Sequence, residues 1–320
     1  MTRAAMLSQL RRWIVAPLVT LLAASFVLYT AVWLQPGNPL TLILGTKASP
    51  AQYHYLAHKL GLDRPMPVRY LDWLIAAVHG NFGTSLVYKQ SVTSLIGPRI
   101  VTTLLLVAYA SVIILVVGVA LGIIGGMSPR AAPVVAGLSG LGVAVPGFVA
   151  AELLTAVFAV KLGWFPVLGT GQGLPGRLQH LTLPAFALAI ASIAYVSQIT
   201  RAAVSIEAHS PHVETARGRG LSAPRILRRH VLRNAAMPIL TVSALTVASL
   251  LAGTLVVEYA FGLGGIGSLL DQSVQDKDSN VVLAIGLILV LVFVITTTAL
   301  DFIQYVIDPR LRQKPAAKWH

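Results

Sequence analysis

Long apolar runs, separated by shorter polar segments, dominate the pattern of hydrophobic and polar positions along this 320-residue chain. A helix rises about 1.5 Å per residue, so about 20 apolar residues are enough to cross the hydrocarbon core of a bilayer. Runs of that length lie at residues 13–35, 99–126, 133–160, 182–205, 236–258 and 280–307. The pattern predicts an all-α integral membrane protein with six transmembrane helices.

The segment between the first two runs, residues 36–98, is too polar to span a membrane but carries helix signals of its own. Ser49 and Pro50 suit the N-cap and first position of a helix, and apolar residues follow them at helical spacing. A second short helix is expected from Pro67 to Val78, with Gly80 ending it. We therefore expect an external helical insertion after the first span.

Basic residues gather in the segments that would lie on one side of a six-span chain. The two termini, the 126–132 joint and the 206–236 loop carry most of them, whereas 161–181 and 259–279 hold few. Short cytoplasmic loops carry an excess of lysine and arginine, while a loop as long as 36–98 translocates largely regardless of charge. Both termini are therefore expected in the cytoplasm, in a multi-pass protein of the cell's inner (plasma) membrane.

These runs and charges predict the organisation of the chain. Residues 1–35 would form the cytoplasmic N-terminus and the first transmembrane helix, and residues 36–98 the external helical loop. Residues 99–308 would form a five-helix core that includes the 206–236 cytoplasmic loop, and residues 309–320 a cytoplasmic tail.

Composition supports the membrane assignment. The chain is 56% hydrophobic and only 11% charged, whereas soluble domains carry about a quarter charged residues. The net charge is +13, but the basic residues lie at the ends of apolar runs rather than on one face of a soluble fold. This distribution argues against nucleic-acid binding. The absence of cysteine removes disulfides, thiolate metal sites and cysteine nucleophiles.

The 206–236 loop is the segment most suggestive of a partner. Ser210 and Pro211 are expected to begin one short helix, and Ser222 to cap a second. Gly220, between them, suits the left-handed conformation that ends a helix. Two short helices projecting into the cytoplasm are shaped to be gripped by another protein, although charge alone also fits a positive-inside loop with no partner.

The order Glu214-Thr215-Ala216, three residues, then Gly220 resembles the EAA loop of ABC importer permeases. The stretch HVETARGRGLSAPRILRRHVLRNAAMPIL (212–240) is similar to the version in dipeptide, oligopeptide and nickel importers, the branch of the dipeptide permease B subunit. Further segments that resemble this branch are LGLDRPMPVRYLDWLIAAVHGNFGTS, HLTLPAFALAIASIAYVSQITRAA, VVEYAFGLGGIG and LDFIQYVIDPRLR. Together they cover most of the chain.

The resemblance implies an importer-permease (MetI-like) fold that forms half of a translocation pathway for di- and oligopeptides. It also implies a second permease subunit, two cytoplasmic ABC ATPase subunits and an external substrate-binding lipoprotein. The loop residues expected to couple to the ATPases are Glu214, Thr215, Ala216, Arg217, Arg219, Gly220, Leu221 and Arg225. The arginines among them are expected to add charge contacts. The chain departs from the branch at Glu214, where the branch usually has a basic residue.

ATP and Mg are expected on the partner ATPases, and no cofactor on this chain. No lysine stands in a G-x-x-x-x-G-K-[ST] setting. Gly262, Gly264 and Gly267 spell G-x-G-x-x-G, but they follow a membrane span rather than a strand and predict a tight re-entry turn. No Ser/His/Asp arrangement can be argued either, so the chain is not expected to be an enzyme.

Two further features lie inside the predicted spans. Gly118, Gly122 and Gly126 form overlapping G-x-x-x-G steps, which favour close helix packing. Pro146 allows a kink in the third span, and Glu152 follows it at a depth where a charge is costly. Pro146 and Glu152 could therefore face the translocation path, or Glu152 could form a structural hydrogen bond instead.

Other interpretations stay open at this point. Importers of this branch also carry nickel chelates, haem or other small solutes. A secondary transporter would use intramembrane acids as ion sites, for which Glu152 is the one candidate, and an intramembrane enzyme would need a nucleophile and base. Glu258 and Asp301 are expected to be structural. His54 and His58 have metal-capable spacing but no third ligand nearby, so no metal site is assigned.

Overall fold

The computed structural model describes residues 11–34, 44, 49–59, 61 and 63–307. Within them the chain is helical apart from loops and one isolated bridge between Thr84 and Ser91. The predicted tail, 309–320, lies outside the described residues.

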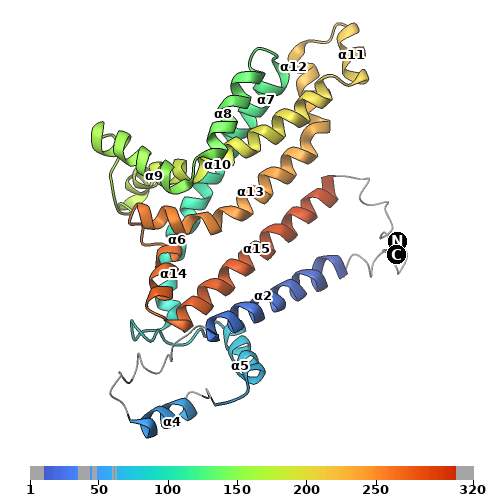
Figure 1. Cartoon of the computed structure of the whole chain (residues 1–320). Coiled ribbons are helices and arrows are strands. Elements are labelled where there is room, and N and C mark those ends of the chain that lie inside the picture. The colour runs from blue at the N-terminus through green and yellow to red at the C-terminus, as the bar shows by residue number, and fades with distance from the viewer. Residues whose placement is uncertain (1–10, 35–43, 45–48, 60, 62, 308–320) are drawn as a thin grey trace.

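The helices follow one another along the chain (Figure 1). The first are the π-helical turn η1 (Arg11–Val15), α2 (Ala16–Trp33), α4 (Pro50–Lys59) and α5 (Met66–Val78). The central ones are α6 (Val92–Ile113), η2 (Ile114–Gly118), α7 (Val119–Met127), α8 (Ala132–Ala144), α9 (Gly147–Leu154), η3 (Thr155–Lys161) and α10 (Gly173–Ala208). The last are α11 (Pro211–Gly218), α12 (Ala223–Ile226), η4 (Leu227–Val231), α13 (Leu232–Ala260), α14 (Ile266–Gln275) and α15 (Ser279–Ile307).

Five of the predicted spans correspond to helices that are long and apolar enough to cross a membrane: Trp13–Trp33, Val92–Met127, Gly173–Ala208, Ala223–Ala260 and Ser279–Ala299. Two of these helices begin before the apolar runs that predicted them: α6 begins at Val92 rather than at 99, and α10 at Gly173 rather than at 182. At Val92 the reason is local: the Ser91 hydroxyl accepts a hydrogen bond from the amide of Ser94, over 3.2 Å, and caps the helix.

The third predicted span, 133–160, is not one continuous helix. It is a bent pair, Ala132–Ala144 and Gly147–Lys161, whose axes differ by 101°. Pro146 has no amide hydrogen and disfavours the helical conformation of the residue before it. Val145 is accordingly extended, with ψ 114°, and Pro146 itself has ψ 144°. The kink predicted at Pro146 is thus a full break, which makes this segment a broken span or a re-entrant loop.

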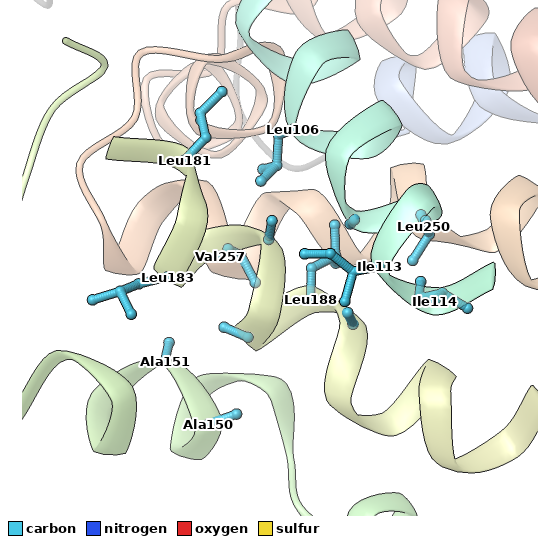
Figure 2. Close-up of a cluster of buried hydrophobic side chains, with 14 of the residues drawn as sticks. Leu106, Ile113, Ile114, Ala150, Ala151, Leu181, Leu183, Leu188, Leu250 and Val257 are labelled. Atoms are coloured by element: carbon cyan, nitrogen blue, oxygen red, sulfur yellow. The ribbon is translucent and has the colours of Figure 1, made fainter. Parts of the chain in front are cut away.

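Helix α10 is the centre of the bundle and packs against α6, α7, α8, α9 and α13. The largest cluster of buried apolar side chains surrounds it (Figure 2), and residues of α9 such as Ala150 and Ala151 lie in that cluster. The glycine stripe lets α7 approach α10 closely. A Cβ on Gly122 would lie 2.3 Å from Thr200 Cβ, and one on Gly126 would lie 2.7 Å from Val204 Cβ. The expected packing role of these glycines is confirmed.

Helices α2 and α15 lie side by side (Figure 1). The start of α2 and the end of α15 lie toward the same end of the bundle as α11 and α12, whereas α4 and α5 lie at the opposite end. The predicted external insertion and the predicted cytoplasmic loop therefore occupy opposite ends of the long helices, as their assignment requires.

Aromatic side chains fasten α5 to the end of α2. Tyr29 packs edge-on against Tyr70, with ring centroids 5.6 Å apart, and in a tilted arrangement against Trp73, at 5.4 Å. The Tyr70 hydroxyl lies 2.8 Å from the Ser25 hydroxyl. Helix α4 begins as predicted with a capping box: the Ser49 hydroxyl accepts a hydrogen bond from the Gln52 backbone amide, and the Gln52 side-chain oxygen accepts one from the Ser49 backbone amide.

Candidate functional site

Two short helices, α11 and α12, form the tip of the loop 206–236, which we call the arginine-rich loop (Figure 1). Gly220 ends α11 in the left-handed conformation, with φ +76°. The amide of Leu221 donates to the carbonyl of Ala216 over 3.2 Å, and that of Gly220 to Arg217 over 2.9 Å. This is the Schellman arrangement of a helix C-terminus, so the predicted break at Gly220 is confirmed.

Both helices begin where predicted but without side-chain caps. Ser210 and Ser222 stand at the N-cap positions of α11 and α12, yet neither side chain caps its helix. The Ser210 hydroxyl instead donates to the carbonyl of Glu207, over 2.7 Å. Ser222 therefore occupies the predicted N-cap position, but the predicted hydrogen bond from its side chain is wrong. Pro224 lies in the first turn of α12, where proline is tolerated.

One face of α11 and α12 is buried against the ends of α10 and α13. Val213, Ala216 and Ile226 belong to an apolar cluster with Val204, Ala208, Val231, Ala235 and Ile239. Ala216 is only 4% exposed, so it holds α11 in place rather than offering a contact to another protein. The tip of the loop is thus a folded element on the bundle.

The opposite face of the loop is polar and basic. Glu214, Thr215, Arg217, Arg219, Gly220 and Arg225 are exposed, and Leu221 is half-buried. Arg228, Arg229 and Arg233 are exposed as well, so Glu214 is the one fully exposed acid of a basic loop, in which Glu207 is half-buried. Such a surface suits a partner that carries acidic groups.

The loop is continuous with a membrane span. Helix α12 passes through the π turn η4 into α13, and residues Ala223–Ala260 count as one long helix. Only the turn Arg219–Ser222 separates α11 from this helix, and His209–Ser210 separates it from α10. A force on α11 would therefore reach two long helices over a few residues.

Glu152 and Pro146 lie apart from this loop. Glu152 is on α9 and is exposed on the surface of the chain, and Pro146 is exposed at the break between α8 and α9. Among the described residues, the structure therefore does not give Glu152 a buried structural partner. Glu258 has the structural role expected of it: it is fully buried and caps the N-terminus of α14.

One anchoring residue was missed by the sequence analysis. Asp278 is fully buried between α14 and α15, and its carboxylate accepts hydrogen bonds from the Ser85 hydroxyl and the Val87 amide. Asn280 adds a bond to the Thr84 carbonyl over 2.8 Å. These contacts hold the segment before α6 against the junction of α14 and α15. The position of Asp278 just before a helix was the available signal.

The described part of the chain has an apolar crevice but no cluster of metal ligands. It holds no group of three histidine, cysteine, aspartate or glutamate side chains that could bind a metal ion. An apolar crevice of about 670 Å³ lies between α2 and α15, lined by Trp13, Pro17, Val294, Ile295, Thr298, Ala299 and Phe302. A lining of this kind suits lipid rather than a charged solute.

Comparisons with known proteins bear on the whole chain. Residues 118–313 match the family described as the inner membrane component of binding-protein-dependent transport systems, and residues 6–107 match its N-terminal part. The oligopeptide transport system permease protein AppB of Bacillus subtilis is 34% identical over 90% of this chain and 92% of its own length. A protein described as a peptide permease in Brucella ovis is 34% identical over 91% of this chain and 95% of its own.

Solved structures show the same fold. A chain of the MetNI methionine ABC transporter, in an inward-facing conformation, aligns with a TM-score of 0.54 at 14% identity, covering 68% of this chain and 97% of that one. A chain of an amino acid ABC transporter aligns with a TM-score of 0.52 at 22% identity, covering 67% and 94%. The expected MetI-like fold is confirmed.

Proposed function

Because the chain belongs to the family of binding-protein-dependent transport system inner membrane components, we propose that it is the permease subunit of an ATP-driven importer of di- and oligopeptides. The peptide cargo is supported by the names of relatives that match nearly the whole chain, among them the oligopeptide permease of Bacillus subtilis. In this assignment the chain forms half of the translocation pathway.

The observation that carries the proposal is the geometry of the arginine-rich loop. Its helix α11 has an apolar face seated on the bundle and a basic face exposed to solvent. It is joined within a few residues to α10 and to the α12–α13 helix. We assign the exposed residues Glu214, Thr215, Arg217, Arg219 and Arg225 to contacts with a cytoplasmic ABC ATPase. Ala216, Gly220 and Leu221 fix the shape that presents them.

The mechanism that follows is alternating access. Two ATPases bind ATP and Mg, close on each other and carry the α11 helices of two permeases with them. The motion passes from α11 into α10 and α13, which pack against each other along the core. The pathway between the two permeases then opens to one side of the membrane or to the other, and ATP hydrolysis resets it.

The remaining assignments concern partners and orientation. The exposed apolar surface of α8 and α9, with Glu152 and Pro146 on it, is assigned to the pathway or to the second permease. The arginine-rich loop and both termini are placed in the cytoplasm, and α4, α5 and the 80–91 segment outside. That outer end would receive an external lipoprotein that delivers the substrate.

Purification of the tagged chain from its own membranes in a mild detergent, followed by mass spectrometry, tests this function. The expected result is co-purification of two ABC ATPases, a second permease and a lipid-anchored binding protein. Recovery of the chain alone, active in uptake driven by an ion gradient, would contradict it. Glu152 would then be the residue to study as an ion site.

A further inference from the structure

A polar cluster joins the start of α11 to the ends of its two neighbouring helices. The Nε2 atom of His212 lies 3.2 Å from the Asn234 amide nitrogen, 3.3 Å from the Ser210 hydroxyl and 3.7 Å from a Glu207 carboxylate oxygen. The Asn234 amide also donates to that Glu207 oxygen, over 3.3 Å. The three long side chains thus form a closed triangle.

Each corner of the triangle comes from a different helix. Glu207 lies in the last turn of α10, His212 in the first turn of α11 and Asn234 in the first turn of α13. The ring of His230, on the turn η4, lies beside that of His212 with centroids 6.4 Å apart. His212 is therefore the point at which α10, α11, η4 and α13 meet.

The cluster lies at the surface, and its members differ in exposure. The Glu207 side chain is half-buried, at 27% exposed, whereas that of His212 is 45% exposed. In the tautomer with its proton on Nδ1, His212 Nε2 accepts from the Asn234 amide. Glu207 stands at the negative end of the α10 dipole, where a carboxylate is unfavourable, and the donors around it offset that effect.

The cluster supplies what the apolar contacts beneath α11 lack. Val213 and Ala216 hold α11 down through burial, which is non-directional and would allow it to slide or turn. Hydrogen bonds weaken steeply as their angle and distance change, so they fix the register of a helix against its neighbours. His212 is the residue of α11 that carries such bonds to α13.

We propose that His212 is a positioning residue, which locks α11 to α10 and α13 so that motion imposed on α11 moves both helices together. The proposal rests on the proposed function, because it concerns how an ATPase stroke is transmitted. Loss of the lock would leave ATP hydrolysis running while α11 shifts against the bundle, so the uptake obtained per ATP would fall.

The experiment uses the whole importer in proteoliposomes, with its binding protein and a labelled peptide, and measures uptake and ATP hydrolysis on the same sample. In His212→Ala, ATP hydrolysis is expected to persist while the uptake per ATP falls by about fivefold or more, the size of a modest coupling free energy. His212→Gln is expected to recover most of the ratio, because its amide reaches the position of Nε2. His212→Asn, one methylene shorter, is not.

His209 provides a matched control. It lies three residues earlier, directly after α10, but its Nδ1 lies 2.8 Å from the carbonyl of Ser205 in that helix. His209→Ala is therefore expected to leave the uptake per ATP unchanged.

An unchanged uptake per ATP in His212→Ala would overturn the proposal, and so would a glutamine variant as impaired as the alanine variant. If His212→Ala does not assemble, Asn234→Leu breaks the same bridge from α13 and is read in the same way. Failure of the unmodified chain to associate with any ATPase would refute the proposed function instead.

Discussion

The Thr103 hydroxyl, on α6, donates a hydrogen bond of 2.5 Å to the fully buried carboxylate of Glu258, on α13. The other oxygen of that carboxylate accepts from the amides of Gly267 and Ser268, over 2.8 and 3.1 Å. Glu258 therefore ties three helices together and caps the start of α14. Its neighbour Gly265 has no room for a side chain, because a Cβ there would lie 2.3 Å from the carboxylate carbon.

Removing this carboxylate should destabilise the fold. A buried donor left without an acceptor costs about 1–3 kcal/mol, and Glu258→Ala would leave three of them, so we expect a loss of about 3 kcal/mol or more. In Glu258→Gln the amide oxygen can accept from the two backbone donors while its NH₂ group faces Thr103, so the loss should be small. Thermal denaturation in detergent, followed by size-exclusion recovery, measures both. Equal losses for the two variants would contradict the capping role.

The contact between α7 and α10 predicts an effect of one methyl group. In Gly122→Ala the new carbon would lie 2.3 Å from Thr200 Cβ and 2.9 Å from the Ser197 carbonyl oxygen, so the helices must separate. Overpacking of this kind costs about 1–3 kcal/mol. Gly140→Ala is the control, because no heavy atom lies within 4 Å of its Cβ position. Equal thermal stability of the two variants would refute the close approach.

The left-handed residue at the end of α11 predicts a defect in coupling. Gly220 has φ +76°, a conformation that β-branched residues avoid, so Gly220→Val should disrupt the turn that leads from α11 into α12. We expect lower peptide uptake and lower stimulation of the ATPases by substrate. Both are measured on the reconstituted importer.

Gly218→Ala is the control for Gly220→Val, because it adds a side chain to the loop without straining the backbone. Gly218 has no left-handed conformation and no heavy atom within 4 Å of its Cβ position, so Gly218→Ala should keep α11 folded. Normal uptake by Gly220→Val would show that the shape of this turn does not matter for coupling.

Local signals predicted much of the structure. Apolar runs located the spans, Ser49 marked the start of α4, and Gly220 marked the end of α11, because each feature depends on residues close in sequence. The glycines of the second span predicted a close helix contact but could not identify α10 as the partner. Helix pairing depends on residues far apart in the chain.

The rest depended on tertiary geometry. Proline at 146 permits anything from a slight kink to the observed 101° bend between α8 and α9, and packing against α10 decides which. Ala216 belongs to a motif read as a contact with another protein, yet burial by Val213 and its neighbours makes it a packing residue. The partners of Asp278 and His212 lie on other segments, so a single sequence gave little sign of either cluster.

The central claim is that the exposed face of α11 contacts a cytoplasmic ATPase, and site-specific photo-crosslinking tests it most directly. A photoreactive amino acid would replace the exposed Thr215 on α11 or, as the control, the exposed Ala51 on α4 at the opposite end of the bundle. Irradiation of native membranes should join position 215, and not position 51, to an ABC ATPase. If position 215 gives no such product, or position 51 gives the same one, the assignment of the arginine-rich loop is contradicted.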